Sequence, residues 1–274
     1  MKEFTILILS HNKPERCRSL ETLMKCNYQG DYFLVIDDND KYIEEYKKIY
    51  PNNLLIFKKS DYIKGSMNNE IQKSPYYARN FCFDYCKEHY KYFLMLDDDI
   101  TNFLYIVEDV ERNKLSKMRI PDINKTFKVM MNYLDKTSID CLAFSNDGGN
   151  FGGIDGRYKN GCSRIVNQAM MFRSSTSARF IGAYNEDLNI CLNDSNLMME
   201  LYILAVSSPS RGGNKAIGYS DNFFIENFYS KIYKPGKVKL TMNKNCQVIV
   251  KKFVKRLMPK IISQRYMKPS AYTL

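Results

Sequence analysis

Short apolar strands alternate with helical segments along the first hundred residues of the chain. The strand patterns cover residues 4–9, 31–38, 54–59 and 92–99, and residues 74–90 have helical spacing. Nearly continuous apolar runs are typical of strands that are covered on both faces, and strands that alternate with helices favour parallel pairing. The pattern predicts an α/β fold with a mostly parallel sheet and helices on both faces.

The pattern is less regular after residue 100. Residues 122–136 have helical spacing, and residues 139–145 and 164–174 are predicted strands. The glycine-rich loop at 146–156 lacks the spacing of a phosphate-binding or dinucleotide-binding loop. A second loop, rich in glycine and serine at 207–221, is predicted to be either a mobile flap or a disordered segment.

Two of the predicted strands end in carboxylates. Asp37 and Asp38 follow one apolar run, and Asp97, Asp98 and Asp99 follow another. Ligands of open α/β sheets bind at the carboxyl ends of the strands, so both sets should line one cleft. Mg²⁺ and Mn²⁺ prefer carboxylate oxygens, and a bound cation would offset the repulsion among adjacent aspartates. Asp97 and Asp99 project to the same side of an extended segment and are the predicted pair for such a cation. The alternative is a solvated strand end.

The composition indicates a globular chain in a reducing compartment. Hydrophobic residues make up 45% of the chain, and no apolar run approaches the roughly 20 residues that span a bilayer. The first residues include an apolar stretch without a small-residue cleavage site, which favours a strand over a signal peptide. The eight cysteines form no CxxC pair, and neither histidine completes a zinc-like spacing. We therefore expect a cytoplasmic protein with reduced thiols.

The positive charge is concentrated in the last 48 residues. Residues 227–274 contain twelve of the 41 lysines and arginines and no acidic residue, whereas the other 226 residues carry 29 basic and 30 acidic side chains. One-signed segments of this kind bind polyanions such as nucleic acid or an anionic membrane. A solvated tail is the alternative. We expect one α/β domain at 1–226 and a basic C-terminal segment at 227–274, which packs on the domain or extends from it.

The order of these motifs resembles the GT-A glycosyltransferases, and more narrowly the phage TET-associated glycosyltransferases. The likeness is carried by YARNFCFDYCKEHYKYFLMLDDDI, by IDCLAFS with its glycine loop, by YNEDLNICL, and by MPKIISQRY near the end. The resemblance implies a GT-A-like (Rossmann-like) domain that moves a sugar from a nucleoside diphosphate sugar, with UDP the expected nucleotide. It implies a hydroxymethylated pyrimidine in double-stranded phage DNA as the acceptor, 5-hydroxymethylcytosine before 5-hydroxymethyluracil. The modification would protect the DNA from host nucleases, and the enzyme would act in the cytoplasm of the host cell.

The resemblance also implies roles for several acidic residues. Asp97 and Asp99 match the family's DxD motif, which holds Mg²⁺ or Mn²⁺ so that the leaving diphosphate is stabilised. Asp98 would point away from the cation, toward the donor ribose or a backbone donor. Asp187 matches the base that activates the acceptor hydroxyl, with Glu186 as the second candidate. Both residues also fit the N-terminal cap of a helix, which is the alternative.

Further residues near the strand ends are expected to bind the donor. They are Ser10, His11, Asn12, Asp37, Asp38, Arg79 and Asp98. Asp37 and Asp38 would serve equally well as turn residues, and His11 as a capping or surface histidine. Arg79 could contact the diphosphate or form a salt bridge with an aspartate, and a helix-surface arginine is the alternative. Many metal-dependent GT-A enzymes bring a late histidine to the metal. No histidine follows His89 here, which leaves the third metal ligand open.

The basic segment is expected to contact DNA phosphates. Its named candidates are Lys251, Lys252, Lys255, Arg256, Lys260 and Arg265. Two other functions remain compatible with the sequence. A GT-A enzyme with a cell-surface glycan or lipid-linked acceptor would lay the stretch VIVKKFVKRLMPKIISQ on an anionic membrane. A binding module that holds nucleic acid without catalysis is the third possibility, and the aspartate set argues against it.

Overall fold

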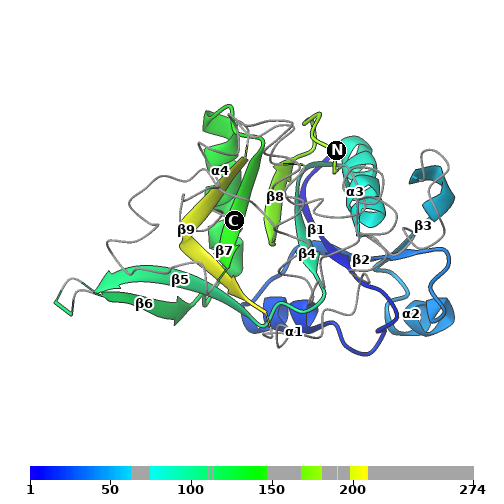
Figure 1. Ribbon diagram of the computed structural model, residues 1–274, viewed down its shortest axis with the longest axis horizontal. Coiled ribbons are helices and arrows are strands. Elements are labelled where there is room, and N and C mark those ends of the chain that lie inside the picture. The colour runs from blue at the N-terminus through cyan, green and yellow to red at the C-terminus, as the bar shows by residue number, and fades with distance from the viewer. Residues whose placement is uncertain are drawn as a thin grey trace, which may run out of the picture. The chain divides into compact units, whose positions relative to one another are not determined.

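One nine-stranded sheet organises the part of the chain that the structure describes (Figure 1). The structure is a computed structural model, and its described residues are 1–62, 75–109, 111–112, 114–146, 168–180, 190 and 198–208. All of them belong to one compact unit of the chain. The strand order is β3-β2-β1-β4-β8-β7-β9-β5-β6.

The first four strands form the parallel half of the sheet. They are β1 (Lys2–Leu9), β2 (Asp31–Asp37), β3 (Leu54–Phe57) and β4 (Tyr90–Asp97). β1 pairs in parallel with both β2 and β4, and β2 pairs in parallel with β3. Their apolar runs are buried because helices cover both faces, as the continuous hydrophobic pattern predicts.

The other five strands make the whole sheet mixed. They are β5 (Asn102–Asp109), β6 (Lys114–Arg119), β7 (Cys141–Asn146), β8 (Met170–Arg173) and β9 (Met198–Ser207). β8 is antiparallel to β4 and β7, and β5 is antiparallel to β6 and β9. Only β7 and β9 run parallel to each other in this half. The expected α/β class is confirmed, but the mostly parallel pairing holds for the first half alone.

Helices cover both faces of the sheet, as expected. α1 (Arg18–Lys25), α2 (Ile43–Ile49) and α4 (Ile123–Lys136) contribute Leu23, Tyr46 and Phe127 to one core cluster that also contains Ile6 and Leu94.

α3 (Tyr76–His89) packs on the opposite face. There the ring of Phe83 lies 5.3 Å from that of Phe93 in β4 and 4.8 Å from that of Phe172 in β8. A short 3-10 helix, η1 (Lys59–Tyr62), follows β3. Successive residues of β4 therefore face different helices, which explains why the whole strand is apolar.

The expected elements up to residue 100 agree with the structure, with boundaries that differ by a few residues. The helix predicted at 74–90 is α3, and the helix predicted at 122–136 is α4, where the side chain of Asp122 accepts a hydrogen bond from the Asn124 amide. The hairpin of β5 and β6 and the strand β9 were not predicted from the sequence.

Several expected features lie outside the described residues. They are the glycine-rich loop after residue 146, nearly all of the loop at 207–221, and the boundary between 226 and 227. Within the described part, five cysteines are buried and none forms a disulfide. None of the helices in that part is both long enough and apolar enough to cross a membrane.

Candidate functional site

The carboxyl ends of β2, β1 and β4 lie side by side on one edge of the sheet. Leu9 at the end of β1 is level with Val35 in β2 and with Asp97 in β4. Asp37 therefore stands just beyond the end of β1 on one side, and the triplet that begins at Asp97 starts on the other. The two carboxylate sets share this edge, as the alternation of strands and helices predicts.

The loop after β1 contacts the middle aspartate of the triplet. Ser10 donates a hydrogen bond from Oγ to Oδ2 of Asp98 at 3.1 Å. The Nζ atom of Lys13 lies 3.3 Å from Oδ1 and 3.4 Å from Oδ2 of the same carboxylate. Tyr46 of α2 holds this loop in place through its hydroxyl group. The hydroxyl is hydrogen-bonded to Ser10 Oγ at 2.8 Å and accepts a hydrogen bond from the Lys13 amide at 3.0 Å.

Asp98 is buried, with 7% of its surface exposed. Burial raises the pKa of this carboxyl group, against the lowering effects of Lys13 and Ser10, and the neighbouring Asp99 raises it further. The expected orientation of Asp98, away from a bound cation and toward the donor ribose or a backbone donor, stays a prediction. Its partners, however, are the side chains of Ser10 and Lys13.

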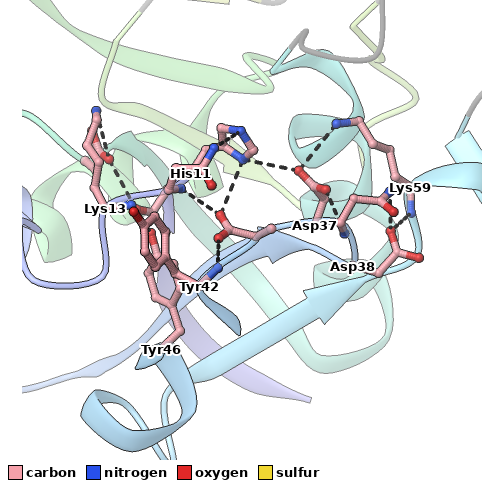
Figure 2. Close-up of polar contacts among 12 residues, drawn as sticks. His11, Lys13, Asp37, Asp38, Tyr42, Tyr46 and Lys59 are labelled. Carbon is pink, nitrogen blue, oxygen red and sulfur yellow. Dashed lines mark hydrogen bonds and ion pairs between the residues drawn. The ribbon is translucent and has the colours of Figure 1, made fainter. Parts of the chain in front are cut away.

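His11 joins the other carboxylate set to the same loop. Its Nδ1 atom lies 3.5 Å from Oδ2 of Asp37 and 3.4 Å from Oδ2 of Asp40 (Figure 2). Asp40 also accepts a hydrogen bond from the backbone amide of Asn12 at 2.7 Å. Asn12 has a φ of 56°, in the left-handed region that asparagine tolerates better than most residues. His11 is thus held between two carboxylates, and the loop has a defined conformation.

Asp37 is paired with a lysine from the next strand end. Its Oδ2 atom lies 3.4 Å from Nζ of Lys59, and both side chains are nearly buried (Figure 2). Burial alone would raise the pKa of Asp37, but the hydrogen bond with His11, the charge of Lys59 and the amide of Asn39 together lower it. The adjacent Asp38 is exposed and accepts a hydrogen bond from the Lys59 amide at 3.0 Å.

Arg79 of α3 contacts the first aspartate of the triplet. Its Nη2 atom lies 3.5 Å from Oδ1 of Asp97, and its guanidinium lies 5.0 Å from the ring centre of Phe180. Only 5% of Arg79 is exposed, so the alternative of a helix-surface arginine is wrong. The side chain of Asp97 keeps 36% exposure, and Asp99 is also partly exposed.

The partly exposed carboxylates of Asp97 and Asp99 are of the kind that hard divalent cations bind. Within the described ranges, no group of three or more histidine, cysteine, aspartate or glutamate side chains is placed to hold a metal ion. The pair would therefore need water or a ligand's own oxygens to complete the shell. Mg²⁺ commonly keeps several waters and binds in this way to one or two carboxylates and a substrate phosphate.

Four residues of this edge were not predicted from the sequence: Lys13, Asp40, Tyr46 and Lys59. Asp40 belongs to the acidic run DDND after β2, so the same strand-end signal includes it. Lys13 belongs to the predicted loop after β1, three residues beyond Ser10. Lys59 reaches the site through the pairing of β3 with β2, and Tyr46 through the packing of α2, and no local pattern reveals either contact. Several predicted residues lie outside the described part: Glu186, Asp187, Lys251, Lys252, Lys255, Arg256, Lys260 and Arg265.

Comparison with known families gives one match that spans most of the chain. A model of the TET-associated glycosyltransferase family matches residues 4–206, a range that contains the whole edge described above. No curated protein matches the chain.

Comparison with solved structures gives distant likenesses. TarS from S. aureus has 14% sequence identity and a TM-score of 0.48, and the match covers 93% of this chain but 43% of TarS. Glucosyl-3-phosphoglycerate synthase from Mycobacterium tuberculosis, crystallised with Mg²⁺ and uridine diphosphate, has 8% identity and a TM-score of 0.46, with 77% of this chain and 72% of that one covered. GlyE from Streptococcus pneumoniae TIGR4 has 14% identity and a TM-score of 0.39, with 73% and 45% covered. The chain thus spans less than half the length of TarS.

Proposed function

Because the chain belongs to the family of TET-associated glycosyltransferases, we propose that it transfers a sugar from a nucleoside diphosphate sugar to a base of DNA. The acceptor is the hydroxyl of a 5-hydroxymethylpyrimidine, with 5-hydroxymethylcytosine preferred over 5-hydroxymethyluracil, and the preferred donor is a UDP-sugar. In a phage, this modification would protect the DNA from nucleases in the host cytoplasm. The observation that carries the proposal is the family match over residues 4–206.

The edge formed by β1, β2 and β4 supports the donor half of this proposal. Breaking the sugar–phosphate bond leaves a diphosphate whose negative charge must be stabilised. Asp97 and Asp99 would hold a divalent cation there together with the diphosphate oxygens, since both carboxylates keep exposed surface at the strand end. The cation would act as a Lewis acid on the leaving group.

The loop after β1 and the end of β2 would bind the nucleoside. His11 contacts Asp37 and Asp40, and the Asn12 amide donates to Asp40. Asp38 is exposed beside the buried Asp37. Carboxylates and amides at this position are suited to hydrogen bonds with a ribose or a base. Because Asp98 is buried against Ser10 and Lys13, we propose that it acts on the donor through these neighbours rather than by contact.

Two further roles, activation of the acceptor hydroxyl and binding of DNA, are proposed for residues that the sequence analysis singled out. Asp187, or Glu186 in its place, would take the proton of the acceptor hydroxyl. The lysines and arginines of 227–274 would bind DNA phosphates without regard to sequence. The 5-hydroxymethyl group already projects into the major groove, so the transfer does not require the base to leave the duplex.

The test is to incubate the protein with duplex DNA that contains 5-hydroxymethylcytosine or 5-hydroxymethyluracil, and with a panel of nucleotide sugars and Mg²⁺ or Mn²⁺. The DNA is then digested, and the nucleoside masses are measured. We expect a gain of one sugar mass on the hydroxymethylated base and none on a matched unmodified duplex. Transfer to lipid-linked or glycan acceptors with none to any DNA would overturn the acceptor assignment and favour the cell-surface alternative.

A further inference from the structure

We propose that Lys13 is the protein's own cation for the donor diphosphate, and that Asp98 is the positioning residue that holds it. This inference rests on the proposed function, because it assigns a residue to the diphosphate of the same donor. Lysine binds phosphate as a point charge with three N–H donors, so one or two of them can contact phosphate while another remains on a carboxylate.

The two side chains of this pair differ in their exposure to solvent. Nζ of Lys13 lies 3.3 Å and 3.4 Å from the two oxygens of Asp98. The side chain of Asp98 is 9% exposed, whereas that of Lys13 is 47% exposed. The carboxylate therefore lies inside the protein, whereas about half of the Lys13 side chain is accessible at the edge where β1 and β4 end.

Lys13 differs in this respect from the other cations that pair with carboxylates of this edge. The side chain of Lys59, paired with Asp37, is 10% exposed, and that of Arg79, paired with Asp97, is 6% exposed. Both are enclosed by protein, so they balance the charge of their partners but present little surface to a ligand. Of these three, Lys13 is the cation that a bound anion can reach.

The backbone of Lys13 is also fixed, which lowers the entropic cost of binding. Its amide donates to the hydroxyl of Tyr46 at 3.0 Å, and the preceding Asn12 is anchored by its own amide to Asp40 at 2.7 Å. Tyr46 is fully buried and also contacts Ser10, the second partner of Asp98. A side chain held at both its backbone and its tip presents its charge in a defined place, and such preorganisation favours affinity.

The edge needs a cation of this kind. Asp37, Asp38 and Asp40 stand at the end of β2, and the three aspartates of the triplet stand at the end of β4. A diphosphate that approaches so many carboxylates is repelled unless positive charge is present. A single divalent cation on Asp97 and Asp99 offsets part of this repulsion, and Lys13 supplies a charge that does not depend on the metal.

A structural role for Lys13 predicts a different behaviour, and two variants separate the roles. If Lys13 served only to neutralise the buried Asp98, its removal would have no further effect once Asp98 is replaced by a neutral isostere. We therefore compare Asp98→Asn with the double variant Asp98→Asn/Lys13→Met, since both lack the buried charge. Lys2→Met is the matched control, because Lys2 pairs with Asp31 at the opposite, amino-terminal edge of the same strands.

The measurement is calorimetric titration with UDP, GDP and ADP in the presence of Mg²⁺, repeated with uridine. A charged hydrogen bond contributes enough that we expect the double variant to bind the diphosphate about tenfold more weakly than Asp98→Asn. Uridine affinity should be equal in the two variants, and Lys2→Met should bind UDP as the unaltered protein does. Lys13→Arg in the Asp98→Asn background should restore most of the loss.

Equal diphosphate affinity in Asp98→Asn and the double variant would overturn the inference. An unaltered protein that binds none of the three nucleotides would overturn it together with the donor half of the proposed function. If the expected differences are found but no sugar reaches hydroxymethylated DNA, the inference stands and only the acceptor assignment fails.

Discussion

Arg79 in α3 contacts Asp97 at the end of β4, although 18 residues separate them in the chain. The contact forms because α3 leads directly into β4 and packs antiparallel on it, so that the first turn of the helix lies beside the last residue of the strand. The apolar strand β4 can end in three aspartates because the first two form ion pairs, Asp97 with Arg79 and Asp98 with Lys13.

The first prediction concerns metal dependence. Asp97→Asn and Asp99→Asn should each remove most sugar transfer, because each takes one anionic oxygen ligand from the proposed cation site. Transfer to hydroxymethylated DNA is measured by nucleoside mass, and thermal unfolding is followed to check that the fold persists. Glu44→Gln, an exposed carboxylate of α2, is the control for the loss of one negative charge. Full activity in excess chelator would contradict the proposed metal role.

The second prediction concerns the catalytic base. Asp187→Asn should lower turnover with little effect on donor affinity, because a base acts in the transition state rather than in donor binding. Initial rates at saturating donor are compared with the dissociation constant for UDP. Near-normal turnover in Asp187→Asn together with an inactive Glu186→Gln would transfer the role to Glu186.

The third prediction concerns the basic segment. Residues 227–274 carry twelve positive charges and no negative ones, so the affinity for DNA should fall steeply with salt. Only some of these charges can face a duplex at once, and we expect a slope of log affinity against log salt on the order of −3 to −6. Replacing Lys251, Lys252, Lys255 and Arg256 together by serine should flatten the slope.

The same fourfold variant separates DNA from membrane binding. Donor hydrolysis without DNA should survive the substitutions, because the strand-end carboxylates are unaltered. Unchanged DNA affinity, combined with lost binding to anionic vesicles, would show that the segment serves a membrane instead.

The fourth prediction concerns acid stability. The lowered pKa of Asp37 means that its ionised form, held by His11 and Lys59 and close to Asp40, stabilises the fold at neutral pH. That contribution is present above the pKa of the unfolded chain, about 3.9, and is lost as the pH falls through the lower value in the folded state. In urea unfolding at pH 6 and pH 3, Asp37→Asn should therefore lose less stability on acidification than the unaltered protein. Asp61→Asn, an exposed carboxylate, is the control, and an equal acid loss in Asp37→Asn would contradict the assignment.

The fifth prediction concerns the core beneath α3. Phe83 is fully buried against the rings of Phe93 and Phe172. Phe83→Ala should lower the free energy of unfolding by about 3–5 kcal/mol, because it removes buried apolar surface and leaves a cavity. Val129→Ala, at a position that is 67% exposed, should change it by less than about 0.5 kcal/mol. A loss at Phe83 as small as that at Val129 would mean that α3 does not pack on the sheet in this way.

The sequence predicted the strand-end carboxylates well because two simple signals coincide there. Apolar runs specify buried parallel strands, and parallel strands bring their carboxyl ends to one edge, so Asp37 and Asp97 had to be near each other. The partners of these aspartates were harder to predict. Lys59 and Tyr46 reach the site through the pairing of β3 with β2 and the packing of α2, and neither position has a distinctive local pattern.

The second half of the sheet was predicted less well for a different reason. β6 has the sequence KLSKMR, in which charged residues occupy half of the positions, and it lies at the edge of the sheet. Edge strands are exposed and need no continuous apolar run, so a search for hydrophobic patterns passes over them. The parallel arrangement of the first half ends at β8, which is antiparallel to both β4 and β7.

The position of β9 has a consequence for how the protein is made. β9 lies between β7 and β5, and it is the strand that joins the block β3-β2-β1-β4-β8-β7 to the pair β5-β6. It is also the last of these strands to be synthesised. Until the ribosome has released residue 207, a nascent chain holds two separate blocks with unpaired inner edges, which are the surfaces through which other chains add strands. The chain is therefore most exposed to misassociation during its synthesis. This exposure ends when β9 is inserted between β7 and β5.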